Sequence, residues 1–253
     1  MVIGFIRATY RFSKFVFISL YYLAYVSIRP WFYGFDLKKA IEIRKEWAQF
    51  CLPRIGLDIA HLNSYPLPHP CILIGNHRSY IDPPAVLHLQ DATVVAKAEV
   101  SRWPLIGNGA KASGVLFVKR GERDSRAATL QAMRIALDQG ISVLIFPEGT
   151  THIEPKTIDF KRGAFRLAVE EGIPIVPFAV EYGRVEDAWI GDDTFIRHWW
   201  ECFAQPKIGV KISYGPPIVE KEVDILLHKT KNWIDQELLA LRNLWEVSQA
   251  IRS

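Results

Sequence analysis

The sequence predicts an α/β fold: a mostly parallel sheet flanked by helices and preceded by an N-terminal segment of two helices. From residue 71 onward, short apolar runs alternate with stretches of helical spacing, the pattern of strands joined by helices. The chain has 253 residues, 49% hydrophobic and 23% charged, which suits a large globular domain and excludes a disordered or collagen-like chain. The first 35 residues stand apart because they contain no acidic side chain.

The N-terminal segment is basic and aromatic. Residues 1–58 hold nine Lys and Arg against four Asp and Glu, whereas the rest of the chain has a net charge of −1. A basic end on a nearly neutral body is typical of attachment to an anionic membrane surface. A nucleic-acid-binding protein would spread its basic residues over the folded body, so we exclude nucleic acid as a partner.

The uncharged run at 15–28 is shorter than the roughly 20 apolar residues of a spanning helix. Trp31, Phe32 and Tyr33 follow it, and such aromatics favour the bilayer interface. This favours an interfacial or re-entrant helix, although a short span stays open for residues 15–33. A signal peptide is a weaker alternative, because no cleavage site of small residues follows the apolar run.

A second helix is predicted after Pro30 and Gly34 break the first one, with Asp36 as its N-cap. Between 37 and 51, apolar residues recur near helical spacing, with lysines and arginines among them. A basic amphipathic helix of this kind lies on a membrane surface or packs on the domain, and the sequence leaves both open.

The body of the chain alternates strand and helix. Buried strands are predicted at 71–74, 93–96, 115–118, 143–146, 175–179 and 210–214. Gly140 and Gly172 end two of the intervening helices, and a charged helix runs from residue 221 to the end. We divide the chain into a membrane-associating segment at 1–62 and an α/β domain, including this C-terminal helix, at 63–253.

Residue spacing excludes several classes of site. The three cysteines form no CxxC pair and the seven histidines show no ligand spacing, so we predict neither a disulfide framework nor a metal. Glycines at 107 and 109 begin a dinucleotide motif, but Ala112 stands at its third glycine position. Ser142 lacks the following glycine that the nucleophile elbow of a serine hydrolase requires.

Polar clusters follow three of the predicted strands. They are residues 76–79, Arg120 and residues 147–150. Sites in open α/β sheets lie at the carboxyl ends of the strands, so these clusters predict one site along one edge of the sheet.

His77 and Asp82 are the first candidate pair in this site. Five residues along a regular helix place two side chains roughly 140° apart, so the pair meets only if His77 lies on the loop before the helix. Pro83 favours a helix that starts at Asp82. Asp82 then orients the imidazole of His77 as a general base. The alternative is a capping aspartate beside an incidental surface histidine.

Residues 76–82 (NHRSYID) resemble the NHxSxxD block of the glycerolipid acyltransferases, the family of the bacterial 1-acylglycerol-3-phosphate acyltransferases. Three further blocks are similar and follow the family's order, at 114–120, at 146–150 with 160–163, and at 173–177. The resemblance covers roughly residues 70–215, and the N-terminal segment suits the two-helix membrane motif of such enzymes.

The resemblance implies transfer of a fatty acyl group from a thioester, acyl-CoA or acyl carrier protein, to a lysolipid hydroxyl. The most direct acceptor is 1-acylglycerol 3-phosphate, which gives phosphatidic acid. His77 would take the hydroxyl proton and Asp82 would hold His77, with no bound cofactor. Such an enzyme lies on the bacterial inner membrane among its lipids, with the catalytic domain on the cytoplasmic side.

Candidate substrate-binding residues come from these blocks and their neighbours. They are Asn76, Ser79, Lys97, Gly114, Arg120, Glu148, Gly149, Thr150 and Arg162. Arg120 and Lys97 are candidates for the acceptor phosphate, because a forked donor and a point charge both suit phosphate. Thr151 stands where many family members have a basic residue. Either Arg162 or Lys161 compensates, or the acceptor is another lysolipid such as a lyso-ornithine lipid.

Two other functions stay open at this level. A non-catalytic membrane lipid-binding protein would keep the apolar surface without turnover, and a hydrolase would use water as the acceptor. The sequence leaves acyl chain length, donor type, head group and oligomeric state undetermined.

Overall fold

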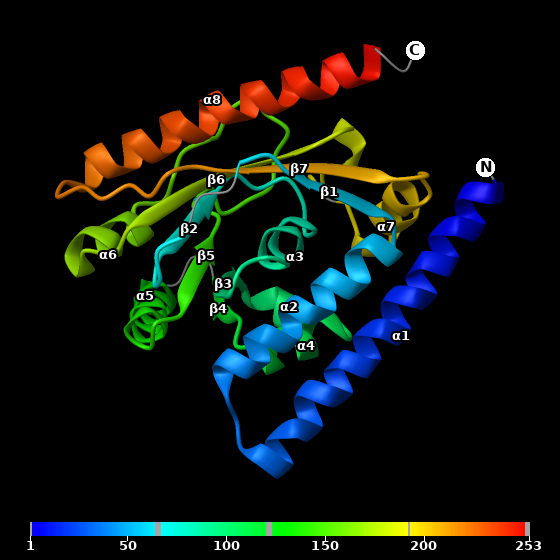
Figure 1. Ribbon diagram of the computed structural model, residues 1–253, viewed down its shortest axis with the longest axis horizontal. Coiled ribbons are helices and arrows are strands. Elements are labelled where there is room, and N and C mark those ends of the chain that lie inside the picture. The colour runs from blue at the N-terminus through cyan, green and yellow to red at the C-terminus, as the bar shows by residue number, and fades with distance from the viewer. Residues whose placement is uncertain (1, 64–66, 120–122, 192, 251–253) are drawn as a thin grey trace.

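The computed structural model describes residues 2–63, 67–119, 123–191 and 193–250. Its centre is a seven-stranded sheet in the order β1-β7-β6-β2-β5-β3-β4 (Figure 1). The strands are β1 (Leu57–His61), β2 (Ile72–Gly75), β3 (Ala92–Lys97), β4 (Leu116–Val118), β5 (Ser142–Ile145), β6 (Ile175–Tyr182) and β7 (Ile208–Tyr214). Among these strands every pairing is parallel except that of β6 with β7, which confirms the predicted α/β fold.

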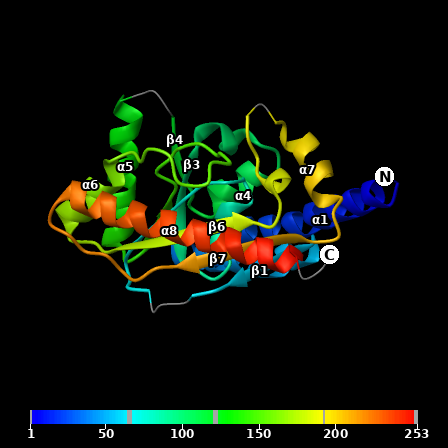
Figure 2. The same cartoon turned by 90° about the horizontal axis from the view of Figure 1, so that it is seen from above.

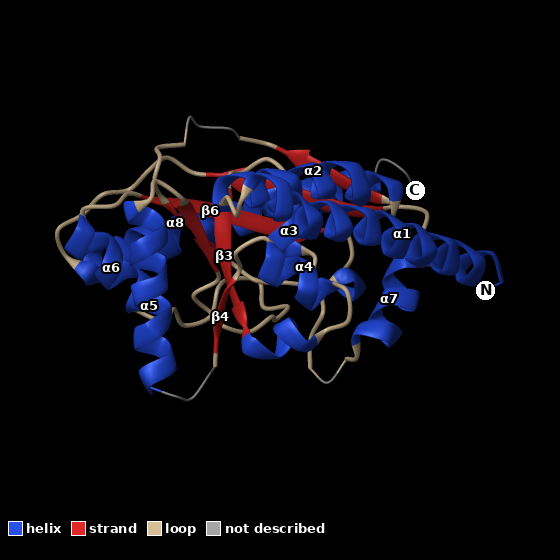
Figure 3. Ribbon diagram, turned by 90° about the horizontal axis from the view of Figure 1, so that it is seen from below, coloured by secondary structure: helices blue, strands red, loops and turns tan. Residues whose placement is uncertain are grey.

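Helices cover both faces of the sheet. They are α1 (Val2–Tyr33), α2 (Leu37–Arg54), α3 (Asp82–Leu87), α4 (Ile106–Ala112), α5 (Arg123–Asp138), α6 (Gly163–Glu171), α7 (Phe195–Phe203) and α8 (Val223–Ala250), with short 3₁₀ turns η1 (Ala98–Arg102) and η2 (Val185–Asp187). Figure 1 shows α8 above the sheet and the hairpin of α1 and α2 below it. Figure 2 shows α8 in front of β6 and β7 from above, and Figure 3 shows α1 to α4 on the near side from below.

Each face of the sheet has its own hydrophobic core. Leu73 of β2 belongs to a core shared with α1, α2, α3 and α7, while its neighbours Ile72 and Ile74 belong to a core built mainly with α5, α6 and α8. Every residue of β2 and of β6 is buried. Strands covered on both faces are mostly apolar, which explains the nearly continuous hydrophobic runs in the sequence.

Two features of the N-terminal segment differ from expectation. The first helix continues through Pro30 and ends at Tyr33, because a proline in the last turn removes a backbone donor only shortly before the helix stops anyway. Gly34 then turns the chain with φ +73°, and the Asp36 side chain caps α2 by accepting from the Lys39 amide. Residues 57–61 form an edge strand paired with β7, although the sequence showed no strand there.

A buried arginine fixes the helical hairpin to the body. The guanidinium of Arg11 on α1 donates to three carbonyl oxygens at the end of α7, those of Phe203 (2.9 Å), Gln205 (2.6 Å) and Pro206 (2.7 Å). The carboxyl end of a helix carries a partial negative charge, which complements the cation. The hairpin therefore packs as part of the folded domain.

Much of α1 nevertheless stays outside the core. By length and composition α1 is apolar enough to cross a membrane. Only 11% of the 18-residue stretch of α1 that meets this criterion is buried in the protein. At its end, Trp31, Phe32 and Tyr33 are 89%, 77% and 77% exposed. An exposed apolar surface of this kind suits contact with lipid.

Candidate active site

His77 and Asp82 meet at the carboxyl edge of the sheet. His77 lies on the loop that leaves β2, and Asp82 is the first residue of α3, followed directly by Pro83. Nδ1 of His77 lies 2.8 Å from Oδ2 of Asp82. The pair meets because the loop between strand and helix closes on itself, as the five-residue spacing requires.

The carboxylate of Asp82 is fully buried and fully bonded. Its Oδ2 accepts from the amides of Arg78 (2.6 Å) and Ser79 (2.8 Å), and its Oδ1 accepts from the hydroxyl of Tyr182 (2.6 Å). Donors aimed at a carboxylate stabilise its ionised form. Burial first, and the charge of Asp82 second, raise the pKa of Tyr182 well above its ordinary value, so the phenol remains a donor.

This arrangement fixes the tautomer of His77. An ionised Asp82 accepts the Nδ1 proton, so the lone pair of the neutral imidazole lies on Nε2. The ring stacks on Phe146 with centroids 4.2 Å apart and planes 18° apart. The His77 side chain is 20% exposed and lines a cavity.

Glu148 holds the loop that faces His77. Its Oε2 accepts from the His77 amide at 2.7 Å, and its Oε1 accepts from Nε2 of His152 (2.7 Å) and the amide of Ile158 (3.2 Å). These contacts account for a carboxylate that is completely buried. Glu148 therefore positions the loops on both sides of the site, and its contacts are with protein groups.

Arg78 completes this framework. Its guanidinium donates to the carbonyl oxygens of His152 and Glu154, both at 2.8 Å, and to the carboxylate of Glu181 at 3.1 Å. The side chain is only 1% exposed, so its charge is compensated inside the protein. The arginine in the NHRSYID segment thus ties the catalytic loop to β6.

The other predicted site residues fall into two groups: those that support the local fold and those that line the cavity. The Asn76 side chain exchanges two 2.8 Å hydrogen bonds with the backbone of Val180 and is buried in the sheet. Ser79 is buried, and its backbone amide donates to the carboxylate of Asp82. Gly114 adopts φ +72° in a turn and accepts from the hydroxyl of Thr93. Arg162 pairs with Asp224 at the surface and is not among the described residues that line the cavity.

A second group of predicted residues lies around the cavity. Lys97, Gly149 and Thr150 line it together with His77 and Thr151. Arg120 lies outside the described residues.

Gly149 adopts φ +72°, and a Cβ there would lie 2.2 Å from Nζ of Lys161. The Lys161 ammonium therefore lies beside Gly149, two residues before Thr151. The positive φ favours glycine at position 149.

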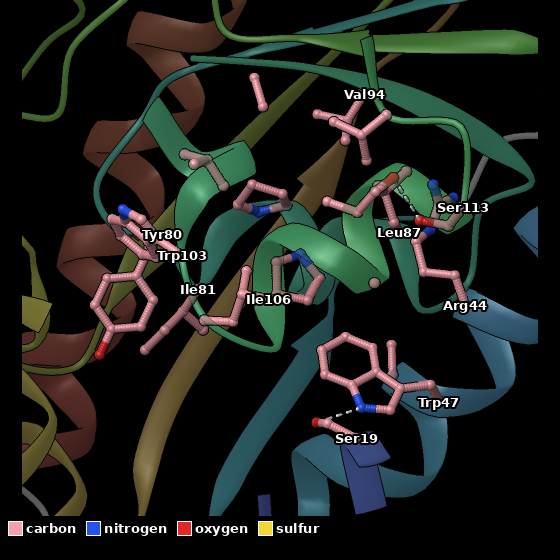
Figure 4. A pocket seen from close by; sticks show the side chains of 18 of the residues that line it. Ser19, Arg44, Trp47, Tyr80, Ile81, Leu87, Val94, Trp103, Ile106 and Ser113 are labelled. Carbon is pink, nitrogen blue, oxygen red and sulfur yellow. Dashed lines mark hydrogen bonds between the residues drawn. The ribbon is translucent and has the colours of Figure 1, made fainter. Parts of the chain in front are cut away.

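The cavity has a polar rim, formed by His77, Lys97 and Thr150, and is otherwise large and apolar. It has a volume of about 580 Å³ and extends between the catalytic edge, α2, α3, α4 and the middle of α1 (Figure 4). Its walls include Leu23, Trp47, Leu87, Val94 and Ile106. An apolar cavity with a few polar groups at its rim is the usual form of a site for a hydrophobic small molecule.

The sequence did not predict several residues that the structure places in the site. Tyr182 lies 100 positions from Asp82, and no spacing rule joins the two. His152 lies four residues after Glu148 within the loop, a spacing that hints at a pair only once the loop is known to fold back. Phe146 was assigned to a strand, but its ring supports His77.

Comparison with known proteins places the chain in a family. The sequence model of the acyltransferase family matches residues 58–181. A lyso-ornithine lipid O-acyltransferase of Pseudomonas aeruginosa is 32% identical over 208 residues, covering 79% of this chain and 80% of the relative. A chloroplast 1-acyl-sn-glycerol-3-phosphate acyltransferase of Brassica napus is 28% identical, covering 78% of this chain but 55% of its own length.

The fold agrees as well. The crystal structure of the 1-acyl-sn-glycerophosphate acyltransferase of Thermotoga maritima superimposes with a TM-score of 0.69 at 20% identity, covering 94% of this chain and 97% of that one. The family match and the curated relatives identify an enzyme that transfers acyl groups. More particularly, the chain belongs to the acyltransferase family that includes the lysophosphatidic acid and lyso-ornithine lipid acyltransferases.

Proposed function

We propose that the protein transfers a fatty acyl group from a thioester, acyl-CoA or acyl carrier protein, to the free hydroxyl of a lysolipid, with His77 as the general base. The observation that supports this most strongly is the imidazole itself. Its Nδ1 is held by a buried carboxylate at 2.8 Å, while the ring lines an apolar cavity. A base oriented in this way has the geometry that proton transfer requires.

The reaction needs one proton acceptor. Nε2 of His77 takes the proton of the acceptor hydroxyl while the oxygen bonds to the thioester carbon. The carbon–sulfur bond then breaks, and the leaving thiolate takes the proton from Nε2. Asp82 stabilises the imidazolium that exists between these two transfers.

The cysteines do not suit a covalent route through an acyl-enzyme. Burial raises the pKa of Cys51 to about 12, and burial also raises the pKa values of Cys71 and Cys202. The thiolate is the reactive form of cysteine, so these side chains are inert. None of the three is among the described residues that line the cavity. Direct transfer from thioester to hydroxyl is the simpler route.

The proposed acceptor is 1-acylglycerol 3-phosphate. Lys97 lines the cavity and is the candidate cation for an anionic head group. Arg120 retains its proposed role at the phosphate from the sequence blocks.

A lyso-ornithine lipid is the second candidate acceptor. Glu99 lines the same cavity as Lys97, and a pair of opposite charges suits a head group that carries both an ammonium and a carboxylate. The absence of a basic side chain at Thr151 points the same way. The name of the P. aeruginosa relative provides independent support.

We assign membrane attachment to the N-terminal segment, residues 1–62, and acyl transfer to the rest of the chain. The exposed aromatics at the end of α1 supply the apolar surface, and the basic residues supply attraction to anionic lipid. A site at the cytoplasmic face of a bacterial inner membrane meets both water-borne thioesters and lysolipids.

The test is a panel of lysolipids assayed in mixed micelles with acyl-CoA and with acyl carrier protein thioesters. We expect free thiol and acylated product in equal amounts, with 1-acylglycerol 3-phosphate the better acceptor and lyso-ornithine lipid the alternative. Thiol release that does not depend on lysolipid would indicate a hydrolase. Absence of thiol release with every donor would indicate a lipid-binding protein and contradict the proposal.

A further inference from the structure

Tyr182 is the side chain that, beside His77, binds the carboxylate of Asp82. It is the last residue of β6, where it pairs with Val210 of the antiparallel strand β7, and it is 5% exposed. Its hydroxyl donates to Oδ1 of Asp82 at 2.6 Å, the distance of a charge-assisted bond from a hydroxyl to a carboxylate. Burial, followed by the charge of Asp82, raises the pKa of Tyr182 well above its ordinary value, so the phenol keeps its proton.

The two oxygens of Asp82 have different partners. Oδ2 accepts from the amides of Arg78 and Ser79 and faces Nδ1 of His77, whereas Oδ1 accepts from the phenol of Tyr182. The side chain of Asp82 is 0% exposed, so bulk water does not replace the phenol. The two amides belong to the backbone of the loop after β2. The phenol is therefore the donor that a substitution can remove without changing the loop.

The phenol and the imidazole share the negative charge of Asp82. A hydrogen bond to a carboxylate stabilises its ionised form and draws charge toward the donor. The imidazolium of His77, which forms when Nε2 takes a proton, is stabilised by the charge that remains on Asp82. A donor on Oδ1 therefore holds the carboxylate toward Nδ1 and at the same time makes Nε2 a weaker base.

The other titratable groups around the pair bind elsewhere. Arg78 forms an ion pair with Glu181 at 3.1 Å, and Glu148 accepts from His152 at 2.7 Å. Tyr80 lies 3.1 Å from His198, and burial raises the pKa of the Cys202 thiol, which is therefore neutral. By element, these groups and the cavity lysine are Arg78 and Tyr80 after β2, Lys97 on β3, Glu148 and His152 after β5, Glu181 on β6, and His198 and Cys202 on α7.

We propose that Tyr182 is a positioning residue that acts through Asp82 to orient His77 and to limit its basicity. Tyr182 itself is not among the described residues that line the cavity, so it acts at a distance from the substrate. This inference rests on the proposed role of His77 as the general base. The competing explanation is a purely structural one, in which the phenol only satisfies a buried oxygen atom.

The two explanations differ in the pH dependence of turnover. In Tyr182→Phe, more of the charge of Asp82 acts on the imidazole, so kcat/KM should begin to fall at a higher pH. A full charge beside a titratable group shifts its titration by about 1–3 units, so loss of one donor should raise the midpoint by roughly 0.5–1 unit. Below the midpoint, kcat/KM should then be roughly 3–10-fold lower than the change at high pH accounts for.

The experiment measures kcat and KM of the full-length protein from about pH 5 to pH 9, with one thioester and one lysolipid. Titration of the acceptor is common to all variants and cancels in their comparison. Tyr214→Phe is the matched control, because Tyr214 is also a buried tyrosine at the end of a strand but donates to the carbonyl of Val86. Thermal unfolding establishes that each variant is folded.

A second variant carries 3-fluorotyrosine at position 182. The ring keeps nearly the same size, but its hydroxyl is a stronger donor and draws more charge from Asp82. The midpoint should therefore move to lower pH, opposite to its movement in Tyr182→Phe. This variant decides the question if Tyr182→Phe does not fold.

Opposite shifts in the two variants at position 182, with none in Tyr214→Phe, support the proposal. A loss by the same factor at every pH, with an unchanged midpoint, would show a structural role and overturn it. An equal shift in Tyr214→Phe would also overturn it, because the effect would then not depend on the bond to Asp82. Failure of the proposed function gives a different result, namely a His77→Ala enzyme that remains active.

Discussion

The two ends of the cavity treat buried charge in opposite ways. At the catalytic edge, Asp82 receives two amides, one phenol and the imidazole, and every partner lies within 2.8 Å. At the other end, Arg44 makes a hydrogen bond to Ala92 and leaves Nε and Nη1 unpaired among the described residues. A buried carboxylate with four donors is rigid, whereas a buried cation with spare donors is costly unless it has a function.

This difference in hydrogen bonding suggests two separate roles, one in the reaction and one in contact with the substrate. In the proposed mechanism, proton transfer needs an imidazole held in one tautomer and orientation, and the contacts of Asp82 within the protein would provide this. Substrate selection and membrane attachment need surfaces that meet lipid, and the apolar wall of the cavity and the exposed helix α1 are the surfaces of this kind. Changes at the first end should therefore reduce turnover of every substrate, and changes at the second should alter preference or attachment.

Among the variants that test this comparison, Asp82→Asn should cause the largest loss of activity. The amide preserves the shape of the side chain but removes the charge that fixes the His77 tautomer, so kcat/KM should fall by roughly 10²–10⁴ with every acceptor. Asp187→Asn is the matched control, because Asp187 is also a buried carboxylate but contacts Cys202, away from His77. A similar loss in both variants would mean that buried carboxylates serve folding alone.

A smaller and selective effect is expected from Lys97→Met. Loss of one charge-assisted hydrogen bond to a phosphate should reduce kcat/KM by roughly 10–150-fold on 1-acylglycerol 3-phosphate. The loss on a monoacylglycerol should be much smaller, since that acceptor has no phosphate. Lys221→Met, at an exposed position far along the chain, provides the control. Equal fractional losses on both acceptors would remove Lys97 from the head-group site.

Membrane attachment should respond to the end of α1. Replacing Trp31, Phe32 and Tyr33 together by serine should weaken binding to vesicles with anionic lipid by at least about 10-fold, with the soluble enzyme still active. Substitution is preferable to deletion because α2 and β1 contribute residues to the core. Serine at Ile135, Ile225 and Leu239, exposed apolar positions elsewhere, is the control set. Equal vesicle binding by both triple variants would place the lipid contact elsewhere.

The smallest effect concerns pH and stability. Burial, with His88 as the second cause, lowers the pKa of His61 to about 4. A histidine whose pKa is lowered in the folded state favours the folded state above its unfolded pKa of about 6.5, and this stability is lost as the pH falls toward 4. On going from pH 7 to pH 5, the Tm of the wild type should therefore fall by roughly 2–4 °C more than that of His61→Phe.

The pH comparison uses the difference between the two proteins because another group acts oppositely. Burial raises the pKa of Asp187 to about 6, which favours the folded state as the pH falls. This contribution is present in both proteins and cancels in the difference. An identical fall in Tm in both would show that His61 is not buried in its neutral form.

The sequence predicted the sheet and one side of the site well, for identifiable reasons. Buried strands are continuous apolar runs, and the polar residues that follow them mark one edge, so His77, Asp82 and Glu148 could be grouped before any coordinates were known. The five-residue spacing of His77 and Asp82 also predicted a loop followed by a helix start, as found.

The remainder depended on tertiary contacts. Tyr182 meets Asp82 because β6 lies beside β2, and Arg44 meets Ala92 because α2 packs across the start of β3. Neither pairing leaves a local pattern in the sequence. The short strand β1 was missed because it has only five residues and is held by its pairing with the distant β7.

The central claim is that His77 is the base for acyl transfer, and its removal tests this most directly. The measurement is kcat/KM of His77→Ala with a thioester and 1-acylglycerol 3-phosphate, beside His228→Ala, an exposed histidine on α8, and with thermal unfolding of both. We predict a loss of roughly 10²–10⁴ in His77→Ala, none in His228→Ala, and unchanged unfolding temperatures. A folded His77→Ala enzyme with activity close to wild type would contradict the mechanism.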